Sequence, residues 1–220
     1  MPLARRQFLS RGAYVVAAGT LAPAWAAAKL APTMPMALGP FYPVEEPIAA
    51  HADLTRLPGH KQRAKGPLIE LTGRVLDVEG RPVPHAEVKV WQANAAGRYH
   101  HHGDDNPAPL DPDFQYFAVE TTDTEGRFRF LTVKPGAYPA GEYMRSPHIH
   151  FDVAGKYDRL ITQMYFPGDS WLKQDKTLLH DLEGHVDPMP DEIFGKLTPG
   201  GSKLDPAATL CQFDVVLQDG

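Results

Sequence analysis

The sequence predicts an all-β fold, a β-sandwich of two sheets with an extended N-terminal arm and at most short helices near the C-terminus. Short runs of β-type residues recur from Leu68 onward, clusters of Gly, Pro and Asp separate them, and no long helical pattern lies between them. The chain of 220 residues, with 43% hydrophobic and 22% charged residues, also has the composition of a soluble protein with one sizeable core.

The first residues have the pattern of an export signal. Arg5-Arg6 precedes an apolar stretch from Ala13 to Leu21, and Ala24-Trp25-Ala26 is a small-x-small cleavage pattern. A membrane span needs about 20 apolar residues, and this stretch is shorter and followed by Pro23. We therefore expect a twin-arginine signal peptide over residues 1–26, cleavage after Ala26, a periplasmic or secreted location, and no stable membrane span after processing. A short buried or membrane-anchoring helix is the alternative.

Charge and cysteine content exclude several classes of protein. Cleavage after Ala26 removes three arginines and no acidic residue, so the net charge falls from −5 to −8, which argues against a nucleic-acid partner. Cys211 is the only cysteine, which excludes an intrachain disulfide, a cysteine-based zinc site and an iron–sulfur cluster. A bound metal would therefore be held by His, Tyr or carboxylate groups.

Residues 27–66 are expected to form an extended arm that wraps or docks on the sandwich. They carry prolines at positions 32, 35, 40, 43, 47 and 58 and show little periodicity. A flexible linker is the alternative. The sandwich domain itself is expected over residues 67–220.

Alternating or continuous apolar runs define the expected strands, which cover residues 68–76, 86–92, 128–133, 148–153, 160–166 and 211–217. In the second run Ala86, Val88 and Val90 alternate with polar or outward residues, as in a strand with one core face. Turn residues such as Lys134-Pro135-Gly136 lie between the runs. Lys173–Leu182 and Asp191–Leu197 are the segments that could form short helices.

The stretch Arg145 to Phe151 carries the strongest chemical signal. Strand alternation places His148 and His150 on one face and Ile149 on the other, so two imidazoles point the same way. Taken alone, such a pair is more often two hydrogen-bonded histidines. Tyr99 follows a strand end and Tyr138 lies in a rigid turn, where loops at a sandwich edge often present ligands, although a lone tyrosine there is more often a rim residue.

These fragments occur together in the order and spacing of a known family. The motifs are Gly39–Tyr42, Trp91–Tyr99, Leu110–Pro112, Lys134–Pro139, Arg145–Phe151 and Thr162–Phe166. Over about residues 38 to 217 the sequence resembles the intradiol ring-cleavage dioxygenases, of the protocatechuate 3,4-dioxygenase and catechol 1,2-dioxygenase type, and most closely the protocatechuate 3,4-dioxygenase subunits.

The resemblance implies a function and a set of site residues. It makes Tyr99, Tyr138, His148 and His150 the ligands of one Fe(III) per active site, with a catechol-type substrate and O₂ giving a muconate-type dicarboxylate. Anionic phenolate oxygens suit a hard Fe(III) ion, which agrees with this ligand set. The resemblance also makes Tyr138 a displaceable, catalytic ligand, Arg145 the residue that stabilises charge on the ring, and Gln163 a polar residue lining the pocket.

Several positions are assigned less specifically. Tyr42 is expected either to reach the substrate pocket or to pack. Ala140 stands where protocatechuate-cleaving relatives tend to have an aromatic residue, so the resemblance does not identify which catechol or hydroxyquinol is the substrate. His100, His101 and His102 are expected in a solvated loop, because consecutive residues seldom converge on one ion. The arm and the resemblance together suggest a homo-oligomer. The alternatives to an enzyme are a non-catalytic binding or carrier sandwich and a periplasmic zinc- or copper-binding protein.

Overall fold

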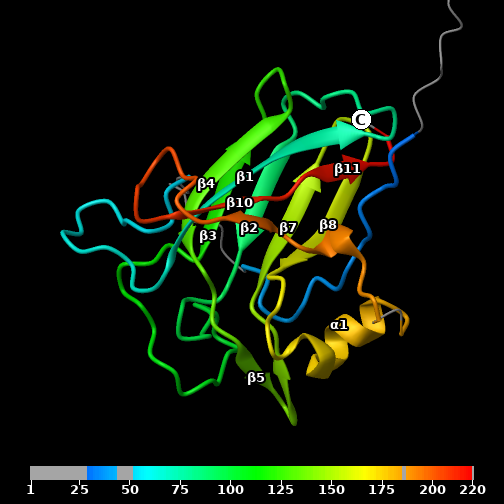
Figure 1. The fold of residues 1–220 in the computed structure, drawn as a ribbon. Helices are drawn as coiled ribbons and strands as arrows, with labels where there is room; N and C mark the ends of the chain where they lie inside the picture. The colour runs from blue at the N-terminus through cyan, green and yellow to red at the C-terminus, as the bar shows by residue number, and fades with distance from the viewer. Residues whose placement is uncertain (1–28, 44–51, 185–186, 220) are drawn as a thin grey trace, which may run out of the picture.

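The structure is a computed structural model that describes residues 29–43, 52–184 and 187–219 (Figure 1). The expected signal peptide, residues 1–26, lies outside the described residues, as does part of the expected arm, residues 27, 28 and 44–51. In the described part of the chain, no helix is both long enough and apolar enough to cross a membrane.

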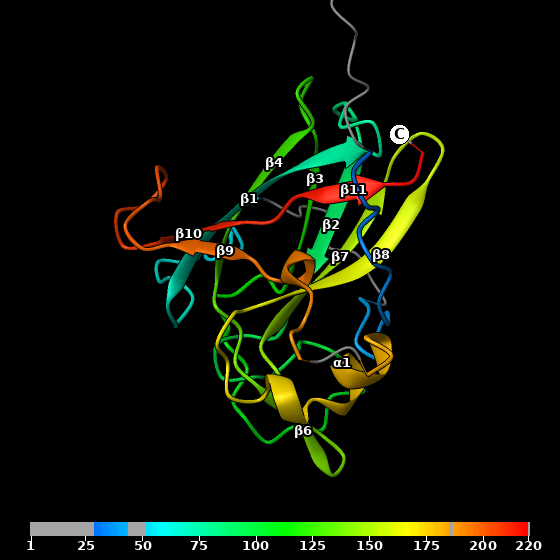
Figure 2. The same ribbon diagram turned by 45° about the vertical axis from the view of Figure 1, so that its right-hand side comes forward.

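Two sheets pack face to face, which confirms the predicted sandwich (Figures 1 and 2). The first sheet contains β1 (Leu68–Asp77), β4 (Arg127–Val133), β9 (Lys196–Thr198), β10 (Thr209–Gln212) and β11 (Val215–Leu217). The second has the order β3 (Phe117–Thr121), β2 (Glu87–Trp91), β7 (His148–Ala154) and β8 (Arg159–Tyr165). A separate hairpin pairs β5 (Tyr138–Ala140) with β6 (Tyr143–Arg145).

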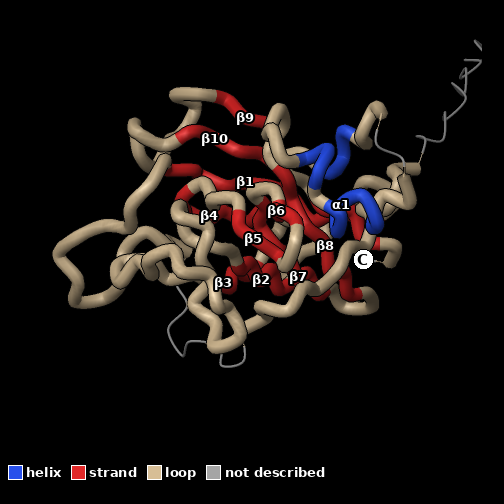
Figure 3. Tube along the Cα trace, turned by 90° about the horizontal axis from the view of Figure 1, so that it is seen from below, coloured by secondary structure: helices blue, strands red, loops and turns tan. Residues whose placement is uncertain are grey.

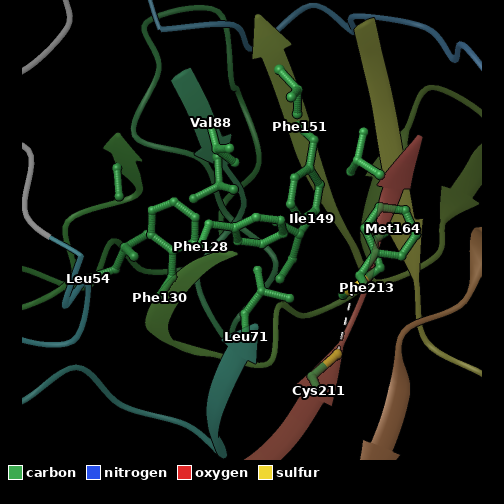
Figure 4. Close-up of a cluster of buried hydrophobic side chains, with 14 of the residues drawn as sticks. Leu54, Leu71, Val88, Phe128, Phe130, Ile149, Phe151, Met164, Cys211 and Phe213 are labelled. Carbon is green, nitrogen blue, oxygen red and sulfur yellow. Dashed lines mark hydrogen bonds between the residues drawn. The ribbon is translucent and has the colours of Figure 1, made fainter. Parts of the chain in front are cut away.

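The hydrophobic core lies between the inner faces of the two sheets (Figure 4). Leu71 and Phe130 from the first sheet meet Val88, Ile149 and Phe151 from the second, and all five side chains are fully buried. Burying each of them stabilises the fold by roughly 1.5–3 kcal/mol. Because Ile149 and Phe151 face this core, the intervening residues of β7 must face the other side of the second sheet.

That other side is also covered, which is why every residue of β7 from His148 to Val153 is buried. The β5–β6 hairpin and helix α1 (Lys176–Asp181) lie at the same end of the sandwich (Figures 1 and 3). The described start of the arm runs along the edge of the sandwich, where Thr33 N donates to Val216 O and Met36 N donates to Ile161 O. Met36 is buried there in a second apolar cluster with Tyr165 and Leu178. The outer face of β7 is therefore an enclosed position.

Each expected strand is present, but three elements were missed and one segment was wrongly assigned. β3, β5 and β6 were not expected, and the run 211–217 is divided into β10 and β11, which both pair with β1. The expected helix Asp191–Leu197 is wrong: only the 3₁₀ turn η2 (Asp191–Ile193) is helical, and β9 follows it. Pairing of β9 with β10 overrides the local helical pattern there. The other expected helix is shorter, a 3₁₀ turn η1 (Leu172–Gln174) followed by α1.

Candidate active site

The two histidines on β7 lie together as predicted. His148 and His150 are each 1% exposed, and their Nε2 atoms are 3.1 Å apart on the outer face of the second sheet. His148 Nδ1 donates a hydrogen bond to the carbonyl oxygen of Ser146 at 2.6 Å, which leaves Nε2 free to act as a ligand. The sheet therefore holds both imidazoles with their Nε2 atoms directed to one point.

Tyr99 reaches the same point from the loop after β2. Asn94 Oδ1 accepts hydrogen bonds from Ala96 N and Arg98 N, and Asp104 accepts one from Tyr99 N at 2.7 Å. The backbone that leads into Tyr99 is therefore held by one side chain before it and one after it in the sequence. Gly97 has φ +81°, and a Cβ there would lie 2.1 Å from Ala137 O. Only glycine lets this loop approach the segment that leads into Tyr138 so closely.

Tyr138 comes from the β5–β6 hairpin, where it pairs directly with Arg145. Its ring meets that of Tyr99 edge-on, with centroids 5.2 Å apart, and both tyrosines are 3% exposed. The sequence pattern predicted a rigid turn at Tyr138. The structure instead gives it the rigidity of a two-stranded ladder.

The four donor atoms form one compact group. Tyr99 Oη lies 3.4 Å from His148 Nε2 and 3.2 Å from His150 Nε2, and Tyr138 Oη lies 3.5 Å from His148 Nε2. Transition-metal bonds of about 2 Å place neighbouring ligand atoms roughly 3 to 3.4 Å apart. Four residues from three separate segments therefore have the spacing of a shared coordination shell, and they fit an iron ion.

Burial tunes the protonation of these groups. Desolvation, reinforced by Arg145, holds the pKa of both His148 and His150 well below the usual value, so both imidazoles are neutral. Desolvation raises the pKa of Tyr99 well above its usual value and that of Tyr138 to about 12, although Arg145 opposes both shifts. In the protein without metal, the imidazoles are ready to bind a cation, whereas each phenol must first lose a proton.

Arg145 is buried next to Tyr138, and all three of its guanidinium nitrogens contact polar atoms. Its Nη1 lies 3.4 Å from Tyr138 Oη, its Nη2 donates to Gln163 Oε1 at 2.7 Å, and its Nε donates to Asp175 Oδ1 at 3.0 Å. Nη2 also donates to Tyr165 Oη at 3.0 Å. Burial by itself would lower the pKa of Arg145, but Tyr138, Tyr165 and Asp175 raise it overall, so the cation persists at the site.

Sequence reasoning missed Asp175 and Tyr165. Tyr165 lies two residues after Gln163 on β8, so strand alternation could have placed it beside Gln163. Asp175 lies 30 residues from Arg145, and its sequence signal is that of a helix cap: it accepts a hydrogen bond from Leu178 N. The same carboxylate accepts Ser146 N at 2.8 Å, which the sequence does not indicate.

Phe41 and Tyr42 are adjacent in the arm, but their side chains pack in different places. Phe41 lies against the two tyrosines, with its ring centroid 4.8 Å from Tyr99 and 6.0 Å from Tyr138. Tyr42 packs edge-on against Trp91 instead, and its hydroxyl donates to Asp152 at 3.3 Å. Ala140 is partly buried beside the same aromatic cluster. Of these two residues, Phe41 is thus the one that faces the candidate tyrosine ligands.

The histidine run does not join the centre. His101 stacks on His102 and faces Phe41, whereas the ring of His100 lies 5.5 Å from that of Tyr116. Among the described residues, no three His, Cys, Asp or Glu side chains gather as a metal-binding group. The candidate ligands that lie together are instead the imidazoles of His148 and His150 and the phenols of Tyr99 and Tyr138.

Comparison with known proteins identifies the family. A family profile described as Dioxygenase matches residues 38–218. The protocatechuate 3,4-dioxygenase beta chain of Burkholderia cepacia is 44% identical over 184 residues, which cover 81% of this chain and 76% of that protein. The chain belongs to the intradiol dioxygenase family. This dioxygenase is also 31% identical over 179 residues to a hydroxyquinol 1,2-dioxygenase from Rhizobium, covering 72% of this chain and 58% of that relative.

Solved structures show that the fold is shared across the family. An intradiol ring-cleavage dioxygenase from Tetranychus urticae superposes with a TM-score of 0.64 at 17% identity, covering 86% of this dioxygenase and 95% of that chain. A hydroxyquinol 1,2-dioxygenase from Pseudomonas putida superposes with a TM-score of 0.65 at 22% identity, covering 86% and 67% of the two chains. The sandwich is therefore the fold common to ring-cleaving enzymes of this kind.

Proposed function

We propose that this dioxygenase holds one Fe(III) ion with Tyr99, Tyr138, His148 and His150, and uses O₂ to cleave a catechol-type ring between its two hydroxylated carbons. The observation that carries the proposal is the approach of these four donor atoms to within 3.1–3.5 Å of their neighbours, beside a buried arginine. A carrier sandwich has no need of a compact ligand set that is paired with a cation.

The residues of the chain have separate tasks in this reaction. Bound iron supplies Lewis-acid activation of the diol toward O₂. Tyr138 Oη is suited to take up a substrate proton, because burial raises the pKa of Tyr138 to about 12 and makes the free phenolate a strong base. Arg145, 3.4 Å from that oxygen, stabilises negative charge on the substrate ring from a site that excludes water.

The substrate is proposed only as a class, catechols and hydroxyquinols. The relatives are named for protocatechuate, hydroxyquinol and catechol, and Ala140 leaves more room beside Tyr138 than an aromatic residue would. Oxygen uptake with a panel of catechol, protocatechuate and hydroxyquinol, together with product analysis, tests the proposal. Iron-loaded protein that cleaves none of these rings contradicts it.

Replacing Tyr138 by phenylalanine is expected to alter the visible absorption and impair turnover. Fe(III) bound to phenolates has a red-brown charge-transfer band, and the variant removes one of two phenolates and a proton acceptor, so kcat should fall by roughly 10²-fold or more. Tyr143→Phe is the matched control, because that tyrosine lies on the same hairpin and its hydroxyl contacts Thr177 at 2.7 Å. Unchanged colour and turnover in Tyr138→Phe would end its assignment as a ligand.

Iron loading is expected to release protons and to strengthen as pH rises. Burial raises the pKa of Tyr99 and Tyr138, so both phenols are protonated near neutrality, whereas the imidazoles are already neutral. Binding as phenolates therefore releases two protons, and the apparent affinity should increase by up to about 100-fold per pH unit. Proton release on loading the apoprotein in weak buffer measures this, and Tyr138→Phe should release one proton fewer. Loading without proton release argues against two phenolate ligands.

We also propose export by the twin-arginine route, cleavage after Ala26 and a periplasmic or secreted location, supported by Arg5-Arg6, the apolar stretch and Ala24-Trp25-Ala26. Sequencing the N-terminus of protein recovered from periplasmic fractions should begin at Ala27. A start at Met1 in those fractions contradicts cleavage.

Assembly as a homo-oligomer is a further proposal, which light scattering of the purified protein tests directly.

A further inference from the structure

The two ligand imidazoles are held in different ways. His148 Nδ1 has a backbone acceptor, Ser146 O, at 2.6 Å. His150 Nδ1 is buried, and no described residue offers it a hydrogen-bond partner. Metal-bound histidines almost always donate their second ring N–H to an acceptor, which fixes the ring orientation. No hydrogen bond from a described residue therefore orients the ring of His150.

Packing supplies that orientation from two sides. The indole of Trp91, opposite His150 in the β2–β7 ladder, stacks on the imidazole with centroids 4.6 Å apart and planes 7° from parallel. The backbone of the arm closes on the edge of the ring: Gly39 has φ +76°, and a Cβ there would lie only 3.2 Å from His150 Cε1. The indole covers one face of the imidazole, and Gly39 lies beside its Cε1 edge, where a Cβ would also be 3.7 Å from Nε2. His150 Nε2 itself is directed toward Tyr99 Oη and His148 Nε2.

The stacked indole is itself braced by the arm. Tyr42 meets Trp91 edge-on at 5.0 Å, and its hydroxyl donates to Asp152, which accepts two hydrogen bonds from Arg159. Trp91 Nε1 is buried and has no hydrogen-bond partner among the described residues, so the indole too is oriented by packing. The segment Gly39–Tyr42 therefore lies beside both members of the stack, with Gly39 next to His150 and Tyr42 against Trp91.

We propose that Trp91 is a positioning residue for the metal centre, and that Trp91 and Gly39 clamp the ring of His150 and thereby slow the loss of iron. The inference rests on the proposed function, in which His150 is an iron ligand. The clamp orients His150 as the Ser146 carbonyl orients His148, and it couples docking of the arm to retention of the metal.

The first test measures iron release to an excess of chelator, followed by loss of the visible band. Trp91→Leu removes the aromatic face and should release iron about 10- to 100-fold faster than the wild type. Trp91→Phe keeps a smaller face and should recover most of the retention. Phe130→Leu is the control, because Phe130 is an equally buried aromatic in the main core. If Phe130→Leu speeds release as much as Trp91→Leu, general destabilisation is the cause and the proposal is wrong.

The second test uses a matched pair of glycines. Gly39 and Gly168 have φ angles of +76° and +75°, but a Cβ at Gly168 would meet nothing within 4 Å. Gly39→Ala should speed iron release and Gly168→Ala should not, because only the first pushes on His150. Equal release from both variants overturns the role of the arm. Wild-type protein that takes up no iron defeats the proposed function and the clamp together, whereas iron-loaded wild type matched by Trp91→Leu defeats the clamp alone.

Discussion

Replacing Arg145 by lysine should lower kcat for ring cleavage by about 10²- to 10³-fold, the usual cost of removing a preorganised charge-stabilising donor. Lysine keeps the positive charge, but it cannot contact Tyr138, Gln163 and Asp175 at once as the guanidinium does. The charge would then no longer be held 3.4 Å from Tyr138 Oη. Steady-state oxygen uptake with the best substrate of the panel measures the effect.

Iron content and thermal unfolding of Arg145→Lys must be measured beside its activity, because the variant tests catalysis only if the site still forms. Tyr165→Phe is the companion variant: it removes the hydroxyl that accepts from Arg145 Nη2 but leaves the guanidinium in place. We expect a smaller fall in kcat for it. An iron-loaded Arg145→Lys protein within about tenfold of wild-type kcat would exclude the proposed role of Arg145.

Replacing Asp175 by asparagine should destabilise the whole fold, by about 3–5 kcal/mol, because it leaves the buried cation of Arg145 without its partner. Both residues are buried, at 3% and 0% side-chain exposure. The two carboxylate oxygens accept from Arg145 Nε, Ser146 N and Leu178 N, so an amide NH₂ would face one or more of these donors. The loss should appear as a lower midpoint in chemical denaturation.

An exposed ion pair provides the comparison for Asp175→Asn. Glu125 lies 3.7 Å from Arg127, and both side chains are more than half exposed. Glu125→Gln should leave the denaturation midpoint almost unchanged, since solvent screens such pairs. A similar small effect of Asp175→Asn would show that the buried carboxylate is not the anchor of Arg145.

Most of the correct predictions about the strands and the two histidines came from the alternation of side chains along a strand. The pattern around Ile149 and Phe151 correctly assigned β7 and placed His148 and His150 on one face, because side-chain direction in a strand depends only on position along it. The family motifs then added Tyr99, Tyr138, Arg145 and Gln163, and the structure brings all of them to one place. Prediction from local sequence failed where pairing with a strand distant in sequence determined the structure. Part of β9 was expected to be helical, but β9 pairs with β10.

The sequence by itself determined the class of fold, the burial of one face of each main strand and the chemistry available at the site, since composition and period are local properties. The tertiary structure decided how that chemistry is held. Only the folded chain brings the carboxylate of Asp175 to Arg145, the indole of Trp91 to His150, and the backbone of Gly39 to the edge of the same ring. These contacts join segments distant in sequence, and short-range pattern does not specify which buried groups meet when two sheets, a hairpin and an arm close on one another.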